Sequence, residues 1–266
     1  MINTIKKQSR RLCVIAIILV IGFLVVSCPL EERDTGDSSG DFEGFTGRVI
    51  SNPGSEQVTG KSGVYDWEFW NQNKQGNASM TIGVGGGGTF KCSWSGILNV
   101  LFRSGRKFGS TQTHQQIGTI SIKYNAPVYN ITSGDVSYLS VYGWTKSPLV
   151  EFYIVESHGN YKPGIAGTLK GNFTIDGAVY DIYQVTRSNA PSIEGNNSTF
   201  QQYFSVRRTK RTSGTISVSK HFEAWENLGM TMGKMYEVAF KVEGYQSSGS
   251  AEITENILSI NGTPIK

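Results

Sequence analysis

Two glutamates lie in the middle of short apolar segments whose side chains alternate as in β-strands. Glu151 is found in Pro-Leu-Val-Glu-Phe-Tyr-Ile-Val, and Glu243 in Phe-Lys-Val-Glu-Gly-Tyr. Because successive side chains of a strand point to opposite faces, Glu151 should share a face with Tyr153 and Glu243 with Tyr245, while the other faces form an apolar core. Two carboxylates beside tyrosines are what acid, base and nucleophilic steps on a glycosidic bond need.

The segment before Glu151 is expected to form a hairpin with it. Residues 138–144 are followed by the turn residues Thr-Lys-Ser-Pro. If the register centres on Lys146 and Ser147, Tyr142 lies directly across from Glu151, and paired residues share a face with Cβ atoms about 5 Å apart. A phenol at this place would donate a hydrogen bond to the carboxylate and keep it ionised, as a nucleophile requires.

Short alternating segments of this kind recur through residues 63–266 and are separated by turn residues. Strands at this spacing predict an antiparallel sandwich or barrel. The run Gly85–Gly88 lacks the Lys-Ser/Thr of a phosphate loop and predicts a hairpin connection. One helix is expected, capped by Ser219 and ended by Gly229. The expected strands are 79–84, 89–94, 117–124, 137–144, 149–156, 169–175, 179–185, 199–207, 215–218, 236–245 and 251–260.

Residues 1–27 have the pattern of an export signal. Four basic residues precede an apolar run that ends in Val-Val-Ser-Cys, which is similar to a bacterial lipobox. Cys28 would then carry lipid and anchor a cell-envelope lipoprotein that faces outside the cytoplasm. The alternatives are the signal of a secreted protein or an uncleaved anchor, although the run is short for a membrane span, which needs about 20 residues. Residues 28–62 are expected to be a flexible tether and 63–266 one domain.

The exported chain is expected to be almost neutral. Removing residues 1–27 takes away four of the 25 Lys and Arg residues and none of the 21 Asp and Glu residues. The charges of the basic cluster 207–211 alternate between two faces of a strand, so binding to nucleic acid is not expected. Cysteines and histidines show no metal-ligand spacing, and neither a metal nor another cofactor is expected.

Four motifs follow one another along the chain. They are Tyr-Gly-Trp at 142–144, Pro-Leu-Val-Glu-Phe-Tyr at 148–153, Thr-Arg at 186–187 with Pro-Ser-Ile at 191–193, and Glu-Gly-Tyr-Gln-Ser-Ser-Gly at 243–249. In this order they resemble glycoside hydrolase family 11, the endo-β-1,4-xylanases. The resemblance implies an all-β fold, a β-jelly roll of two curved, packed antiparallel sheets with one α-helix. It also implies a retaining endo-1,4-β-xylanase with Glu151 as nucleophile and Glu243 as general acid/base.

The resemblance also assigns roles to other side chains. Asn99 matches the neighbour of the acid/base, and a neutral amide there implies activity near neutral pH. Xylan and xylo-oligosaccharides are the implied partners of a monomeric enzyme, with residues 191–193 at the tip of a thumb hairpin that closes over the sugar chain. The residues implied to bind the sugar or position the nucleophile are Trp70, Tyr142, Tyr153, Arg187, Pro191, Ser192, Ile193, Gln202 and Tyr245.

The chain departs from the family pattern at several positions. Glu-Ser-His-Gly at 156–159 replaces the usual Asp-Ser-Trp-Gly, Lys-Pro-Gly follows at 162–164, and Phe204 replaces a common Trp. None of these belongs to the motifs of the catalytic pair. Three other functions stay open: a non-catalytic jelly-roll lipoprotein that captures polysaccharide, an enzyme of the same chemistry that cuts β-1,4-glucan, and a membrane-tethered structural protein.

Overall fold

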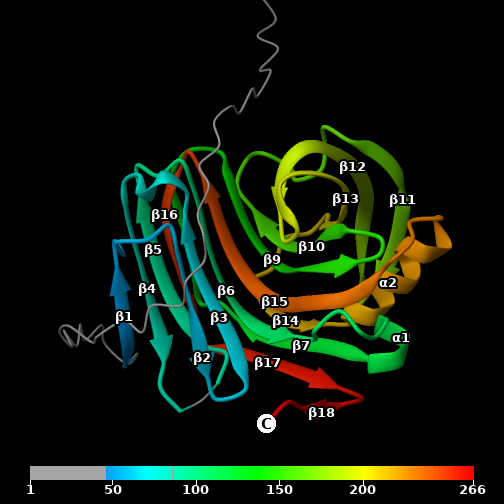
Figure 1. Cartoon of the computed structure of the whole chain (residues 1–266), viewed down its shortest axis with the longest axis horizontal. Helices are drawn as coiled ribbons and strands as arrows, with labels where there is room; N and C mark the ends of the chain where they lie inside the picture. Colours follow the sequence, from blue (N-terminus) through cyan, green and yellow to red (C-terminus); the bar gives the residue numbers. More distant parts are fainter. Residues whose placement is uncertain (1–45, 86) are drawn as a thin grey trace, which may run out of the picture. The chain divides into compact units, whose positions relative to one another are not determined.

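The computed structural model describes residues 46–85 and 87–266, which consist mainly of β-strands (Figure 1). The helical elements are α1 (His114–Ile117), α2 (Val218–Asn227) and the 3-10 turn η1 (Gln72–Lys74). The strands are β1 (Gly47–Ser51), β2 (Gln57–Ser62), β3 (Tyr65–Asn71), β4 (Asn77–Gly83), β5 (Phe90–Ser95), β6 (Asn99–Lys107), β7 (Ile120–Asn125), β8 (Val128–Ser133), β9 (Val136–Lys146), β10 (Val150–His158), β11 (Thr168–Ile175), β12 (Ala178–Ser192), β13 (Gly195–Arg207), β14 (Ser213–Ile216), β15 (Lys234–Tyr245), β16 (Ser248–Ile253), β17 (Glu255–Ile260) and β18 (Thr263–Pro264).

The strands form three sheets. A nine-stranded sheet has the order β11-β12-β13-β10-β9-β15-β6-β3-β2, a five-stranded sheet the order β1-β4-β5-β16-β8, and a four-stranded sheet the order β14-β7-β17-β18. Figure 1 shows the nine-stranded sheet strongly curved, with α2 against its outer side. This is the curved jelly roll that the sequence predicts, with the small four-stranded sheet in addition to the two expected sheets.

One strand pair of the nine-stranded sheet departs from the expected antiparallel pattern. β10 and β13 are parallel, with Glu151 paired with Gln202, and the other pairs in this sheet are antiparallel. The chain leaves β10, forms β11 and β12, and returns as β13, and a crossover of this length allows two neighbouring strands to run in the same direction. The parallel pair brings Gln202 next to Glu151.

The expected tether at residues 28–62 is wrong in its C-terminal part. Gly47–Ser51 and Gln57–Ser62 form β1 and β2, which pair with β4 and β3. Ile50 and Val58 are the side chains of these two strands that pack against the core. Few apolar side chains are needed, because the edge of an existing sheet offers backbone hydrogen bonds to an added strand. Residues 1–45, which include the expected signal, Cys28 and the first part of the tether, lie outside the described residues.

The two faces of the nine-stranded sheet carry different clusters of side chains. The face toward the main core includes Val150, Phe152, Ile154, Val238, Phe240 and Val242. The opposite face, here called the site face, carries a second cluster of Tyr142, Trp144, Tyr153, Val155, Tyr183, Ala190, Phe200, Phe204 and Val206. This division confirms the alternation expected for the strands that carry Glu151 and Glu243.

The helix α2 packs on the core face of this sheet. The ring centroids of Phe222 and Phe152 are 5.0 Å apart. The predicted helix is confirmed, but its N-cap is Ser217 and not Ser219. Ser219 lies inside the helix, where its hydroxyl accepts the backbone N–H of Ile120 at 2.8 Å and so links α2 to β7.

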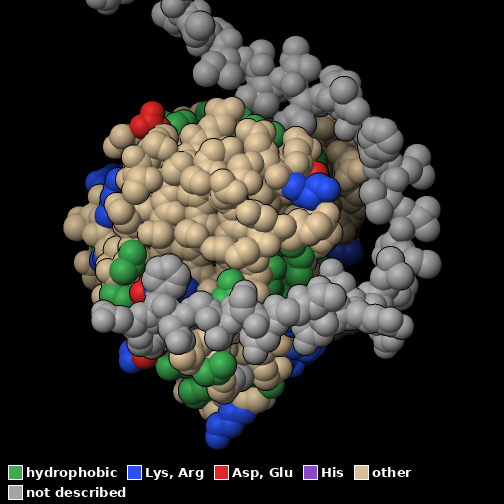
Figure 2. All heavy atoms as spheres, turned by 90° about the vertical axis from the view of Figure 1, so that its left-hand side faces the viewer, with side chains coloured by type: hydrophobic (Ala, Val, Ile, Leu, Met, Phe, Trp, Pro, Cys, Tyr) green, Lys and Arg blue, Asp and Glu red, His purple; other side chains and the backbone are tan. Residues whose placement is uncertain are grey.

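Charged side chains are scattered over the surface that Figure 2 displays. This view of the left-hand side of Figure 1 shows mostly uncharged polar groups and backbone. In the basic cluster 207–211, Arg208 pairs with Asp181 and Arg211 with Glu156. These two ion pairs connect the segment at the end of β13 to β12 and β10. No helix among residues 46–85 and 87–266 is long and apolar enough to cross a membrane.

Candidate active site

Glu151 lies on the site face of β10 and is 7% exposed. Three side chains donate hydrogen bonds to its carboxylate: Tyr142 and Tyr153 to Oε1 at 2.8 and 3.0 Å, and Gln202 to Oε2 at 2.5 Å. The donors belong to β9, β10 and β13, so three adjacent strands hold the carboxylate in place. Hydrogen bonds of this kind stabilise the charged form of a carboxylate.

The two phenols beside Glu151 are suited to remain donors. Burial, followed by the charge of Glu151, raises the pKa of both Tyr142 and Tyr153 well above the usual value. Trp144 Nε1 donates to Tyr142 Oη at 2.6 Å, which leaves the phenol proton of Tyr142 for Glu151. The indole of Trp144 therefore affects the orientation of the Glu151 carboxylate indirectly, because it orients the phenol of Tyr142.

The expected contact between Tyr142 and Glu151 is present, but the predicted register is wrong. Glu151 is paired with Trp144, and Tyr142 is paired with Tyr153. A shift of two residues leaves every side chain on its face, because strand side chains alternate with a period of two. The phenol of Tyr142 reaches the carboxylate along the diagonal, over a distance that aromatic side chains can span.

Glu243 lies on the site face of β15, and its side chain is 14% exposed. Its Oε2 contacts the ammonium of Lys241, which stands two residues earlier on the same strand and is 1% exposed. Lys241 has no role in the motifs of the sequence. The spacing could have revealed this contact, because a lysine two residues from a glutamate on the same strand must share its face.

Arg103 is a second buried cation of the site face that the sequence motifs do not indicate. Its guanidinium pairs with Glu68 at 2.7 Å and with Glu237 at 3.0 Å, and it lies 5.2 Å from the ring centroid of Tyr142. Burial raises the pKa of Glu237, and the charge of Arg103 opposes that rise. These groups form a buried ionic row across β3, β6 and β15 beside the tyrosine.

The other expected sugar-binding residues on the sheet also belong to the site face. Directly paired side chains share a face, and Trp70 is paired with Leu101, which is itself paired with Glu243. Trp70 and Tyr245 are both partly exposed, as contact with a sugar requires. Arg187 is exposed, and within residues 46–85 and 87–266 it has no hydrogen bond or ion pair to Glu151.

The expected thumb tip is the turn between β12 and β13. The hydroxyl of Ser192 accepts the backbone N–H of Glu194 at 2.9 Å, which shapes the turn after the exposed Pro191. Ile193 packs against the cluster of the site face, and the side chain of Glu194 lies 3.9 Å from that of Lys146 on β9. The end of this hairpin therefore rests on the strands that carry the site.

Asn99 lies at the start of β6 and is paired with Tyr245. Its Oδ1 is buried and has no hydrogen-bond partner among the described residues. The side chain that contacts Glu243 is Lys241. The influence of Asn99 on the pH of activity therefore stays a prediction.

Two departures from the family pattern have consequences inside the molecule. Phe204 stacks on Tyr153 with ring centroids 4.6 Å apart, so this position supports a donor to Glu151. Glu156 is fully buried and pairs with Arg211. The change at Phe204 is thus linked to Glu151 by the single ring of Tyr153, which the motifs do not indicate.

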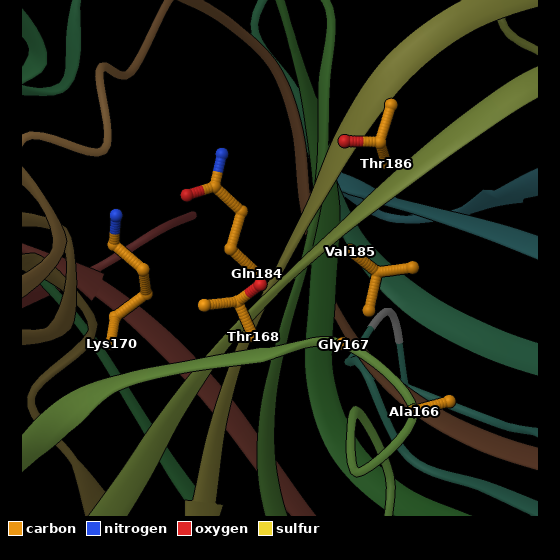
Figure 3. Close-up of a pocket in the computed structure, with 7 residues that line it drawn as sticks. All are labelled: Ala166, Gly167, Thr168, Lys170, Gln184, Val185 and Thr186. Carbon is orange, nitrogen blue, oxygen red and sulfur yellow. The ribbon is translucent and has the colours of Figure 1, made fainter.

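A pocket that neither glutamate lines is formed by β11, β12 and the residues just before β11. Figure 3 shows Lys170, Thr168 and Gln184 close together on these strands. The pocket is lined by Ala166, Gly167, Thr168, Lys170, Gln184, Val185 and Thr186. In the described part of the chain, no three His, Cys, Asp or Glu side chains are arranged to hold a metal ion. Because neither Glu151 nor Glu243 lines this pocket, the candidate active site is the site face of the nine-stranded sheet.

Known proteins resemble the chain over most of the described residues. The sequence model of "Glycosyl hydrolases family 11" matches residues 62–254. The chain is 58% identical to "Endo-1,4-beta-xylanase A" of Bacillus pumilus, over 80% of this chain and 87% of that protein. It is 53% identical to "Endo-1,4-beta-xylanase A" of Thermoclostridium stercorarium over 83% of its length, but spans only 32% of that longer protein.

A solved structure has the same architecture. The family 11 xylanase from Neocallimastix patriciarum matches with a TM-score of 0.72 and 38% identity, over 80% of this chain and 100% of that one. The sequence matches and the structural match therefore indicate the same family. In this fold the two glutamates lie on one face of the curved sheet. The chain belongs to family 11 of the glycosyl hydrolases.

Proposed function

We propose that the protein is a retaining endo-1,4-β-xylanase that cuts internal β-1,4 bonds of xylan, with Glu151 as nucleophile and Glu243 as general acid/base. The observation that carries the proposal is the carboxylate of Glu151, held by three donors on the face that also carries Glu243. Membership of family 11 and the names of the xylanase relatives support the choice of substrate.

In the first step, the carboxylate of Glu151 attacks the anomeric carbon of a xylose unit. The bond from that carbon to the glycosidic oxygen breaks, and the oxygen takes the proton of Glu243. An ester between the sugar and Glu151 forms, as retaining enzymes require. Tyr142, Tyr153 and Gln202 aim the carboxylate before the attack.

In the second step, Glu243 is a carboxylate and acts as base. It takes a proton from a water molecule, whose oxygen attacks the anomeric carbon and releases Glu151. The sugar keeps its original anomeric configuration after two displacements. Trp70, Arg187, Tyr245 and the thumb tip at 191–193 are proposed to bind the xylan chain during both steps.

The substrate is tested by measuring reducing ends released by the purified protein from β-1,4-xylan and from cellulose in parallel. Release from xylan alone is expected, because the hydroxymethyl groups of glucose need additional space. Equal release from cellulose would contradict the xylan specificity. Binding to xylan without release from either polymer would instead identify a capture module.

The retaining mechanism is tested by proton NMR of the first product. The new reducing end is expected to be the β-anomer, which later mutarotates to the equilibrium mixture. An initial α-anomer would mean a single displacement by water and would exclude Glu151 as nucleophile.

The proposal includes export, a lipid anchor at Cys28 and a monomeric enzyme. It is supported by the basic and apolar pattern of residues 1–27 and by the lipobox-like sequence before Cys28. Metabolic labelling with palmitate is expected to mark the parent chain and not Cys28→Ala. An unlabelled parent chain would exclude the anchor and leave a secreted enzyme. Light scattering of the purified protein tests the oligomeric state, for which the mass of a monomer is expected.

A further inference from the structure

Lys241 is a buried cation that contacts the acid/base of the proposed catalytic pair. Its ammonium touches Glu243 Oε2 and lies 4.0 Å from the ring centroid of Tyr142 and 4.2 Å from that of Tyr153. Both phenols donate to Glu151. The ammonium of Lys241 therefore contacts Glu243 directly. It is linked to Glu151 only indirectly, through the two tyrosines whose phenols donate to that carboxylate.

The surroundings explain how a lysine can be buried at this place. A buried ammonium is costly unless it is paired, and here Glu243 supplies the opposite charge while two aromatic rings offer their negative faces. Among the described residues, the charged and titratable groups facing Lys241 are Glu243 on β15, Tyr142 on β9, Tyr153 and Glu151 on β10, and Arg103 on β6, which is itself paired with Glu68 and Glu237. Besides Lys241, the titratable groups that interact with Glu243 are Tyr138 on β9, which is its direct strand partner, Tyr129 on β8 and Tyr153 on β10.

These neighbours act on Lys241 in opposite directions. Burial is the largest effect and lowers the pKa of its ammonium below the usual value, Glu243 and Glu151 oppose this decrease, and Arg103 adds to it. The two glutamates therefore favour the charged form of the lysine. By the same interaction, the charged lysine favours the carboxylate form of Glu243.

On the basis of the proposed function, we propose that Lys241 is a positioning residue that sets the upper pH limit at which Glu243 can donate a proton. The ammonium stabilises the carboxylate, so Glu243 gives up its proton at lower pH than it would beside a neutral side chain. The same contact stabilises the carboxylate left after the proton has passed to the leaving oxygen. The effect opposes the shift toward neutral pH that the resemblance implies for Asn99.

Two substitutions separate the charge of Lys241 from its hydrogen bond. Lys241→Met removes both at similar side-chain length, whereas Lys241→Gln keeps an N–H donor without the charge. Each full-length protein is labelled with ¹³C at the glutamate carboxyl carbons and titrated by NMR, and the resonance of Glu243 is identified by its loss in Glu243→Gln. The pH profile of kcat/KM on xylan is measured for the same proteins.

Both substitutions are expected to move the titration midpoint of Glu243 upward by about one to three pH units. The alkaline limb of the activity profile should move with it. An unchanged midpoint in both variants would overturn the proposal. A shift in Lys241→Met alone would also overturn it, because the charge would then not be the cause.

Thermal unfolding checks that the variants fold. A parent protein that is inactive on xylan would refute the proposed function, while the titration of Glu243 would still decide the role of Lys241.

Lys123→Met is the matched control for the change in net charge. Lys123 is on β7, its side chain is 59% exposed, and it pairs with Glu255 at 2.7 Å. Neither the midpoint of Glu243 nor the alkaline limb should change in this variant. An equal shift in the control would attribute the effect to net charge and overturn the role of Lys241.

Discussion

Tyr142 and Tyr153 face each other across β9 and β10 with ring centroids 5.1 Å apart, and their phenols donate to the same oxygen of Glu151. Because the rings meet edge to face, each limits the movement of the other. The pair therefore holds one oxygen of Glu151 more rigidly than a single donor could, and loss of these phenols should affect reactivity more than folding.

We expect Tyr153→Phe to lower kcat/KM on xylan by about 10- to 100-fold, the value of one hydrogen bond to a charged group. The ring and its stacking on Phe204 remain, so the melting temperature should change little. Tyr203→Phe is the control, since Tyr203 donates to the carbonyl of Thr231 and lies in the main core. A loss of activity as large in the control would contradict a specific role for the phenol of Tyr153.

Glu243→Gln should reduce hydrolysis of xylan by about 10²- to 10⁴-fold, the usual contribution of a general acid. Aryl xylosides with good leaving groups need no proton, so their first step should be nearly unaffected. A burst of phenol release followed by slow turnover would show that the ester with Glu151 accumulates. Glu151→Gln should show neither burst nor turnover, and near-normal hydrolysis of xylan by either variant would contradict its assignment.

Phe204→Leu should lower kcat/KM by about 2- to 10-fold, because an aromatic pair contributes about 0.5–1.5 kcal/mol beyond its buried area. The expected cause is looser positioning of the Tyr153 phenol against Glu151. Phe204→Trp restores a stacking ring and should recover activity. Loss of activity in both variants would indicate that the volume of the side chain matters and not the stacking.

Glu156→Gln should destabilise the fold by about 3 kcal/mol, because it breaks a buried ion pair and leaves Arg211 unpaired. Denaturant unfolding measures the change. Glu255→Gln removes an exposed partner of Lys123 and should cost less than about 1 kcal/mol. Similar losses in the two variants would mean that Glu156 contributes no more than a surface pair.

Stability should fall as pH decreases from about 6.5 to 3. Burial lowers the pKa of His221 from 6.5 to about 3, and the ring lies 4.6 Å from that of Tyr180 with no hydrogen-bond partner among the described residues. Between these values only the unfolded chain binds the proton, so the free energy of unfolding decreases by up to about 1.4 kcal/mol per pH unit. His221→Phe should flatten this slope, and an unchanged slope would assign the loss to other groups.

Much of the site was predictable because strand alternation is a local property. A period of two places Glu151 with Tyr153, and Glu243 with Lys241 and Tyr245, on one face whatever the strands pair with. Two of the errors concern the partners of correctly placed residues. The register between Tyr142 and Glu151 is off by two residues because the turn sets it, and the expected N-cap Ser219 instead bonds the backbone of β7.

Motifs and alternation are enough to predict the family, the curved β-sheet fold and the faces on which the two glutamates lie. The parallel pairing of β13 with β10, which brings Gln202 to Glu151 across 51 positions of sequence, is visible only in the folded molecule. The same is true of the strands formed by the polar segments 47–51 and 57–62 and of the burial of Lys241 against Glu243. Pairing and burial depend on residues far apart in the chain, whereas alternation depends only on neighbours.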